Sequence, residues 1–389
     1  MPDVLLIEAC NFADFPVGGM LSFCKQMMRA FGNRLALVGI STGNTPVGRW
    51  IEKEFDGVTF RYFAIAKWEP LTKKPLVPFR LAAYLQFRRY RKAIYSIGID
   101  NLYTQSEEAI MVMSDMPWKS ICFRFAGVEN SLRMSRYRWS RLFSGIHERL
   151  LFSALRPVNV ILASAGNEAI NQMIQRSNGK LAVERIIRFP TRVDTDIFQP
   201  QCKQQARLQL GIDNDEILVM TCGRLNIVKG WDFILDSFEI FSSYFSKASM
   251  YFVGDGEDRK LLSNRIAKSK FAKSIKITGF LSPHEVARYI NAADIVVVGS
   301  HFEGWSVAMV EALACGKPIV TTDVSGAREM IIEGKNGFIV ENRHPKSFSE
   351  AMCRTLALKE VEHISLTIAN KYALKHLASD LGTLWKPLA

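Results

Sequence analysis

Two glutamates, Glu303 and Glu311, stand at either end of a stretch that follows the apolar run Ile295–Val298. This order predicts a strand, a loop that holds Glu303, and a helix with Glu311 about two turns in. The two carboxylates are placed to hold two ends of one elongated ligand, and the helix start offers amides for a phosphate. An ordinary amphipathic helix with an acidic start is the alternative. The amides concerned belong to Gly304, Trp305, Ser306 and Val307.

A second loop, Gly223 to Gly230, follows the apolar run Ile217–Met220 and therefore lies at another strand end. Its Arg224 offers a planar fork for phosphate oxygens, and its Lys229 offers a compact point charge. Glycines in such a loop let the backbone come close to a ligand. A surface loop with two solvated cations is the alternative.

A third loop, Gly254-Asp255-Gly256, follows the predicted strand Met250–Val253. A glycine pair of this kind is usually only a turn. Three such loops at successive strand ends carry more weight, because open parallel sheets bind ligands at the carboxyl ends of their strands. The sequence therefore predicts one ligand site built from the three loops.

The second half of the chain resembles glycosyltransferase family 4, the retaining enzymes with the GT-B fold. Its motifs agree with the family in order and spacing, whereas the first half agrees more loosely. The resemblance implies an α/β fold of two Rossmann-like, doubly wound parallel-sheet domains that face a central cleft. Besides the three loops, the matching motifs are Gly279-Phe280, Ala292–Asp294, Ala314–Pro318 and Gly326–Glu329.

The resemblance also implies roles for individual residues. Arg224 and Lys229 would neutralise the leaving diphosphate, and Glu303 would hold the donor sugar and its phosphate; these three are the predicted catalytic residues. Glu311 would bind the ribose hydroxyls. No metal or other cofactor is expected, since relatives need none and the nucleotide-sugar is a substrate. The predicted donor-binding residues are Gly18, Gly19, Gly223, Gly254, Phe280, Leu281, Gly304, Trp305, Ser306, Val307 and Glu311.

Length and patterning indicate two domains. A chain of 389 residues is long enough for two cores, and strand and helix signals alternate as in parallel sheets. We predict an acceptor-binding domain at 1–193, a nucleotide-sugar-binding domain at 194–370, and a helix at 371–389 that crosses back to the first domain. The pair Asp194 and Asp196 resembles a metal-binding pattern, but it lies in the predicted linker.

Strands are predicted at positions spread along the whole chain. Those of the first half are Val4–Ala9, Leu35–Ser41, Thr59–Ile65, Asn101–Thr104, Ser120–Phe125, Val158–Ala163 and Arg185–Phe189. Those of the second half are Ile217–Thr221, Met250–Val253, Ile275–Thr278, Ile295–Val298, Ile319–Thr322 and Phe338–Val340.

The first half departs from the family in one respect. Many relatives carry a histidine in a first-domain loop near the reacting sugar, but the first 146 residues here contain none. The corresponding stretch runs from Phe123 to Asn130, and the acceptor-facing candidates in it are Arg124, Glu129 and Asn130. Gly18 and Gly19, between the first strand and the helical stretch Met20–Phe31, occupy the place of a paired glycine of the family.

Charge is concentrated in the first half. Residues 1–193 hold 27 Lys and Arg against 15 Asp and Glu, whereas the remainder holds 23 of each. Aromatic residues alternate with the basic ones at 61–92 and at 133–143. This mixture favours an anionic membrane surface; single-stranded nucleic acid and a solvated face over buried aromatics are the alternatives. An odd number of cysteines without a CxxC motif and a start without a basic signal favour a cytoplasmic location.

Together these features predict a retaining, metal-independent hexosyltransferase that is peripherally bound to the inner face of the membrane. It would move a hexose from a UDP- or GDP-sugar to a growing, lipid-linked glycan in the biosynthesis of a surface polysaccharide such as lipopolysaccharide. No nucleic acid is expected as a partner. Two other classes remain open: a sugar-nucleotide epimerase of similar two-domain fold, and a non-catalytic protein that binds anions or nucleic acid.

Overall fold

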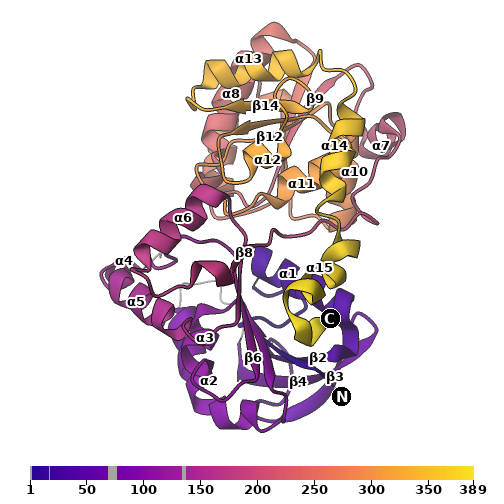
Figure 1. Ribbon diagram of the computed structural model, residues 1–389. Coiled ribbons are helices and arrows are strands. Elements are labelled where there is room, and N and C mark those ends of the chain that lie inside the picture. Colours follow the sequence, from indigo (N-terminus) through magenta and orange to yellow (C-terminus); the bar gives the residue numbers. More distant parts are fainter. Residues whose placement is uncertain (1, 17, 69–76, 134–136) are drawn as a thin grey trace. The chain divides into compact units, whose positions relative to one another are not determined.

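The computed structural model describes residues 2–16, 18–68, 77–133 and 137–389. The chain forms two compact units, and each has its own sheet (Figure 1). Unit 1 consists of Met1–Pro190 together with Lys375–Ala389, and unit 2 consists of Thr191–Leu374. The predicted boundary after residue 193 lies three residues beyond the observed one, and the return to unit 1 begins at Lys375 instead of residue 371.

Unit 1 is built on an eight-stranded sheet of order β3-β4-β2-β1-β5-β6-β7-β8. All neighbouring strands are parallel except the hairpin of β3 and β4. The chain order reverses at β1, which pairs with β2 on one side and β5 on the other. The strands are β1 (Val4–Ile7), β2 (Leu35–Ser41), β3 (Trp50–Phe55), β4 (Val58–Lys67), β5 (Asn101–Thr104), β6 (Ser120–Phe125), β7 (Val160–Ala163) and β8 (Ile186–Arg188).

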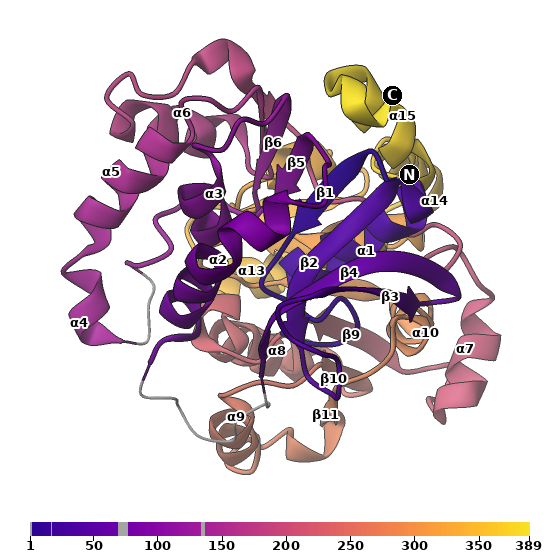
Figure 2. The ribbon, with the colours of Figure 1, turned by 90° about the horizontal axis from the view of Figure 1, so that it is seen from below.

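Helices cover both faces of this sheet, as right-handed crossovers in two directions require. The helices α1 (Gly19–Phe31) and α15 (Leu377–Leu384) contact each other. The helices α2 (Phe79–Tyr95) and α3 (Glu107–Met113) pack together, and α3 also contacts α5 (Ser144–Ala154). Seen from below, α2 and α3 lie across the sheet from α1 (Figure 2). The short α4 (Arg138–Arg141) and α6 (Asn167–Arg176) complete the unit.

Unit 2 is built on a six-stranded, fully parallel sheet of order β11-β10-β9-β12-β13-β14. The chain order reverses between β9 and β12, so the carboxyl ends of these two strands form the topological switch point. Strands of this kind, buried on both faces, are continuous apolar runs. They are β9 (Ile217–Cys222), β10 (Ala248–Val253), β11 (Ile275–Gly279), β12 (Ile295–Val298), β13 (Ile319–Thr322) and β14 (Gly337–Val340).

The helices of unit 2 cover its sheet in two layers, each with a hydrophobic core beneath it. In one layer α8 (Trp231–Tyr244) packs on α13 (Pro345–Thr355). In the other, α11 (Val307–Ala314) packs on α14 (Val361–Asn370), and α10 (Pro283–Ala292) packs on α7 (Lys203–Leu210). Ser282 and Glu285 form a capping box at α10, which satisfies amides at the helix start. The remaining helices are α9 (Arg259–Ile266) and α12 (Ala327–Met330).

Every strand predicted from the sequence corresponds to an observed strand, but β3 was missed. It is the antiparallel exception, and the turn Asp56-Gly57 that joins it to β4 has positive φ at both residues. An Asp-Gly pair between two apolar runs is a hairpin signal that could have revealed it. Among the helices of the described residues, none is long and apolar enough to span a bilayer.

Candidate functional site

The loops after β9 and β12 meet at the switch point of unit 2. The His301 amide donates to the Val228 carbonyl at 2.8 Å, so the two loops run side by side. Gly230 makes this approach possible: its φ is 66°, and a Cβ there would lie 1.9 Å from the Gly299 carbonyl oxygen. Only glycine tolerates both conditions. The sequence thus places the Lys229 loop against the Glu303 loop by means of one glycine.

Lys229 and Glu303 form an ion pair across this junction. The Lys229 Nζ lies 2.6 Å from Glu303 Oε1, and the Ser300 hydroxyl donates to the same oxygen at 2.6 Å. The Glu303 side chain is only 9% exposed, whereas that of Lys229 is 38% exposed. The carboxylate is therefore held by two donors and the ammonium keeps access to solvent, so Glu303 positions a cation at the carboxyl end of β9.

The third loop, after β10, is attached to the first by main-chain bonds. The Leu225 amide donates to the Asp255 carbonyl, and the Asp258 amide donates to the Leu225 carbonyl, both at 3.0 Å. A Cβ at Gly254 would lie 2.0 Å from the Gly223 oxygen, and one at Gly256 would lie 2.3 Å from the Leu225 oxygen. These two glycines thus let one loop approach another.

Gly223 differs from its neighbours, since a Cβ there would meet no atom within 4 Å. With Arg224 and Lys229 it lines a small pocket at the ends of β9 and β10. Arg224 is exposed. The two predicted phosphate-binding cations therefore lie beside an open stretch of backbone in unit 2.

Helix α11 begins at Val307, and Ser306 is its N-cap residue. The predicted helix start is thus reproduced, but Glu311 lies just over one turn into the helix rather than two. The Ser325 hydroxyl donates to the Gly304 carbonyl at 2.7 Å and fixes the loop before the helix. The first-turn amides of α11 give this end a partial positive charge.

Trp305 lies in the core below that loop. It is 6% exposed, its ring lies 5.0 Å from that of Tyr372, and it fills the space beside Gly326. Its side chain therefore supports the start of α11 from beneath. The predicted contact with the nucleotide-sugar can come only from its backbone.

Glu311 lies half-buried on α11, close to Cys222 and Cys315. Burial raises the pKa of its carboxyl to about 8. No residue of the described ranges has a hydrogen bond to this carboxylate in the structure. A carboxyl in such surroundings gains from partners that donate hydrogen bonds, as a pair of hydroxyls does.

Phe280 and Leu281 follow β11, which is an edge strand of the sheet of unit 2. Phe280 is 72% exposed and Leu281 is half-buried against the core of unit 2. An exposed ring at a strand end is available for stacking. Asp194, by contrast, closes a turn: its side chain accepts from the Asp196 amide, and its carbonyl accepts from the Ile197 and Phe198 amides.

The remaining predicted residues belong to unit 1. Gly18 is the N-cap of α1 and Gly19 its first residue, and a Cβ at Gly19 would meet nothing within 4 Å. Arg124 is buried, with its guanidinium 3.8 Å from the Phe23 ring centre and donating to Gln105. Asn130 is buried and donates to the Ser144 carbonyl. Arg124 and Asn130 therefore support the fold of unit 1.

Glu129 does line a pocket, at the switch point of unit 1. The same pocket is lined by Glu8, which follows β1, and by Gln105, which follows β5. Glu8 is 3% exposed, its Oε1 accepts from the Ala9 amide, and its Oε2 is buried without a hydrogen bond. Burial raises the pKa of Glu8 to about 8. Glu8 was not among the residues predicted from the sequence, although its position directly after the first strand was a signal.

A histidine that was not predicted from the sequence also lies in this region. His147, on α5, lines the same small cavity as Glu129 and lies 3.6 Å from Glu107. Glu107, Glu108 and His147 could together hold a metal ion by geometry. Arg80 forms ion pairs with both glutamates, so this cluster is already neutralised by a guanidinium. Burial lowers the pKa of His147.

Comparison of structures first defines the class of fold. A sucrose-phosphate synthase from Thermosynechococcus elongatus superposes with a TM-score of 0.80 at 17% identity, over 100% of this chain and 99% of that chain. The HepE protein of Anabaena, solved with UDP and glucose, has a TM-score of 0.72 at 16% identity, over 99% and 100% of the two chains. These likenesses confirm the predicted fold of two parallel-sheet α/β domains of GT-B type.

Comparison of sequences then shows what the second half of the chain is similar to. Residues 203–371, within unit 2, match the model of the family described as glycosyl transferases group 1. A D-inositol 3-phosphate glycosyltransferase from Geodermatophilus obscurus is 30% identical over 187 residues, which are 46% of this chain and 41% of that protein. The match thus spans about two fifths of the relative. The predicted resemblance to glycosyltransferases is confirmed, and assignment to family 4 stays a prediction.

Proposed function

We propose that this protein is a retaining, metal-independent glycosyltransferase. It moves a hexose from a UDP- or GDP-sugar to a growing, lipid-linked glycan in the assembly of a surface polysaccharide. The observation that carries the proposal is the Lys229–Glu303 pair at the switch point of unit 2. It lies within the stretch that matches the glycosyltransferase family.

The chemistry needs charge on the leaving group to be stabilised. The bond between the anomeric carbon and the phosphate oxygen breaks, and negative charge develops on the diphosphate. Arg224 and Lys229 supply fixed positive charge, and the first-turn amides of α11 add to it. The acceptor oxygen forms the new bond on the same face of the sugar, and its proton goes to a leaving phosphate oxygen. Two cations and a helix start take the place of a metal ion.

The sugar, the ribose and the base of the nucleotide-sugar contact other predicted site residues. Glu303 holds the sugar hydroxyls while it positions Lys229, because a carboxylate has more acceptor sites than two donors occupy. The ribose hydroxyls donate to Glu311, and the base lies beside Phe280 and Leu281. A UDP-sugar as the donor is supported by structures of the HepE protein, which has a similar fold and was solved with UDP and glucose and, separately, with UDP-glucose.

The proposed acceptor and location are supported by the charge of the first unit. Its surplus of basic residues favours the anionic inner face of a membrane, where lipid-linked glycans are extended. A phosphorylated polyol is the second candidate acceptor, because the relative from Geodermatophilus obscurus is named for D-inositol 3-phosphate.

Donor hydrolysis and transfer test the proposal. UDP- and GDP-hexoses are supplied one at a time with EDTA present, and release of the nucleoside diphosphate is measured. The wild type is expected to release either UDP or GDP, whichever nucleotide its donor carries. The Arg224→Ala variant should release it far more slowly. Proton NMR of the product should show the anomeric configuration of the donor. Epimerised donor without transfer, or activity that EDTA abolishes, would contradict the proposed reaction.

A further inference from the structure

Helices α4 and α5 lie at the edge of unit 1 (Figures 1 and 2). They expose a run of large apolar side chains. At 100° per residue, Leu142, Ile146 and Leu150 lie along one side of α5 and the turn before it. Small soluble proteins rarely leave a contiguous apolar patch of this kind uncovered. The exposed fractions are 50% for Trp139, 84% for Leu142, 52% for Phe143, 58% for Ile146 and 58% for Leu150.

The other basic and aromatic segment, around α2, is different. Phe87 is fully buried, Tyr90 packs edge-on against Phe63, and Phe79 packs edge-on against Trp68. Arg80 is engaged by Glu107 and Glu108. In the described part of that segment, which excludes 69–76, the aromatic rings are thus buried or packed on one another. The patch on α4 and α5 is the one whose aromatic rings face solvent.

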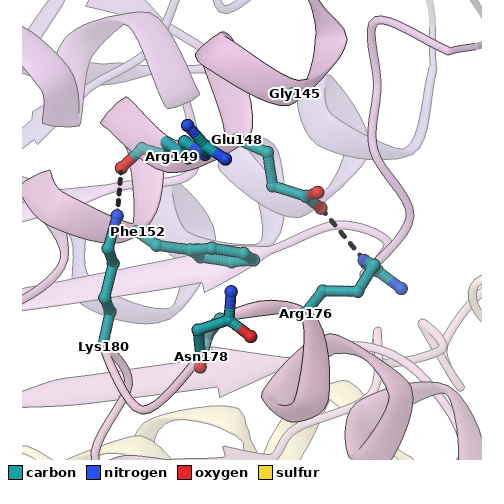
Figure 3. A pocket seen from close by; sticks show the side chains of 8 residues that line it. Gly145, Glu148, Arg149, Phe152, Arg176, Asn178 and Lys180 are labelled. Carbon is teal, nitrogen blue, oxygen red and sulfur yellow. Dashed lines mark hydrogen bonds and ion pairs between the residues drawn. The ribbon is translucent and has the colours of Figure 1, made fainter.

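A polar pocket lies at α5 and the end of α6 (Figure 3). Its lining residue Arg149 directly precedes Leu150 of the apolar patch. It is lined by Glu148, Arg149 and Phe152 from α5 and by residues at and after the end of α6, among them Arg176 and Lys180. Arg176 is engaged by Glu148 at 3.0 Å, and the Lys180 ammonium donates to the Arg149 carbonyl at 3.3 Å. No described residue pairs with the Arg149 guanidinium, so two cations at the pocket are available to an anion.

The local charge also favours an anionic partner. Residues 131–190 contain ten Lys and Arg against three Asp and Glu. A second copy of the chain would bring the same positive charge to the contact, and like charges oppose association. A bilayer with anionic lipids instead attracts such a segment by about 1 kcal/mol per basic residue near the surface.

We propose that α4 and α5 dock on an anionic phospholipid bilayer. The five exposed apolar side chains enter the boundary between headgroups and acyl chains, as in helices that lie in the plane of a membrane. Arg149 and Lys180 bind lipid phosphates beside them. The inference deepens the proposed function, on which it rests for the lipid-linked acceptor, and it assigns membrane contact to one defined segment.

Vesicle flotation with the full-length protein tests this inference. Vesicles of phosphatidylethanolamine with phosphatidylglycerol are compared with vesicles of phosphatidylcholine alone. The wild type is expected to float with the anionic vesicles. Ile146→Ser/Leu150→Ser and, separately, Arg149→Gln/Lys180→Gln should each weaken binding by about tenfold or more. Matched controls are Leu208→Ser, an 81% exposed leucine of unit 2, and Lys260→Gln/Lys268→Gln; both should bind as the wild type does.

Depth of insertion gives an independent readout. Trp139 is the exposed tryptophan of the described residues, so its emission should shift to the blue with anionic vesicles and be quenched by brominated acyl chains. Trp139→Phe should remove both effects. Calorimetry with UDP on the same variants separates this inference from the proposed function, because donor binding in unit 2 should not change.

Three results would overturn the inference. A wild-type protein that binds UDP but does not float with the anionic vesicles would show that unit 1 has no lipid-binding surface. A dimer in sedimentation velocity that Ile146→Ser/Leu150→Ser dissociates would identify a second copy as the occupant. Inorganic phosphate could also compete fully with the vesicles while Ile146→Ser/Leu150→Ser has no effect on binding. That result would show a site for free phosphate and no lipid-binding surface.

Discussion

Arg224 acts, in the proposed reaction, only through charge that develops on the leaving diphosphate. Arg224→Ala should therefore lower turnover by about a hundred- to a thousand-fold while the thermal unfolding temperature stays within error. Arg224→Lys should recover only part of the rate, because a point charge cannot bind two phosphate oxygens at once. Steady-state kinetics with the best donor measure both. Arg265→Ala, which removes an exposed arginine paired with Asp236, is the control and should keep full activity.

Glu311 is expected to contribute mainly to nucleotide binding. Glu311→Ala should weaken UDP binding by about tenfold or more in calorimetry, because it removes two hydrogen bonds, each of which contributes about 0.5–1.5 kcal/mol. The turnover number at saturating donor should change much less. A variant that binds UDP as well as the wild type would remove the ribose-binding role, whatever its activity.

Glu8 should make stability depend on pH. Its folded pKa is raised to about 8 by burial, so between its ordinary pKa and pH 8 the folded state binds more protons than the unfolded state. The stabilisation is present at low pH and is lost as pH rises through the folded pKa. Glu8→Gln should flatten this fall, which is on the order of a few kcal/mol. The free energy of unfolding is measured with urea for both proteins at pH 6 and pH 9, which lie about two units below and one unit above the folded pKa. An unchanged slope would contradict the assignment.

Loops and strands differ in how far sequence could predict them. Buried parallel strands such as β9 and β12 are apolar runs that end in polar loops, so their positions and the loops after them could be read directly. The contact between those loops could not, because it depends on the Gly230 approach to Gly299. The same holds for the Lys229–Glu303 pair, whose members are 74 positions apart.

Exposure was the second property that sequence left open. The segments at 61–92 and 133–143 have similar mixtures of basic and aromatic residues, yet Phe87 is buried and Trp139 is half exposed. The helix α2 packs on β4, where Tyr90 meets Phe63, and this contact cannot be read from the sequence. Likewise Arg124, an acceptor candidate by position, stacks on Phe23 inside unit 1.

Replacement of Gly230 should disrupt the contact between the β9 and β12 loops. Gly230→Ala adds a Cβ 1.9 Å from a carbonyl oxygen at a φ of 66°. Gly211, at a φ of 64° with nothing within 4 Å, is the matched control, and Gly211→Ala should cost only about 1 kcal/mol of unfolding free energy. Gly230→Ala should cost at least about twice that, measured by urea unfolding, and should also lower activity. Equal costs would mean that the loop adapts easily.

At the scale of the whole chain, the last residues leave unit 2 and complete unit 1. The Trp385 indole donates to the Ser120 hydroxyl at 2.7 Å and lies against Tyr103. The Arg34 guanidinium donates to the carbonyl oxygens of Pro387, Leu388 and Ala389. One unit is therefore built from both ends of the chain, while the other is continuous, so the two should respond differently to changes at the C-terminus.

Trp385→Ala should destabilise unit 1 selectively, by about 3–5 kcal/mol, because it removes a buried ring and leaves unit 2 intact. Trp385→Phe, which keeps an aromatic ring but loses the bond to Ser120, should cost about 1 kcal/mol. Scanning calorimetry with and without UDP separates the units, since a ligand raises the unfolding temperature only of the part that it binds. The UDP-sensitive transition should be unchanged in Trp385→Ala while the other moves to lower temperature. A single transition that shifts as a whole, or loss of the UDP effect, would mean that the two units do not unfold independently.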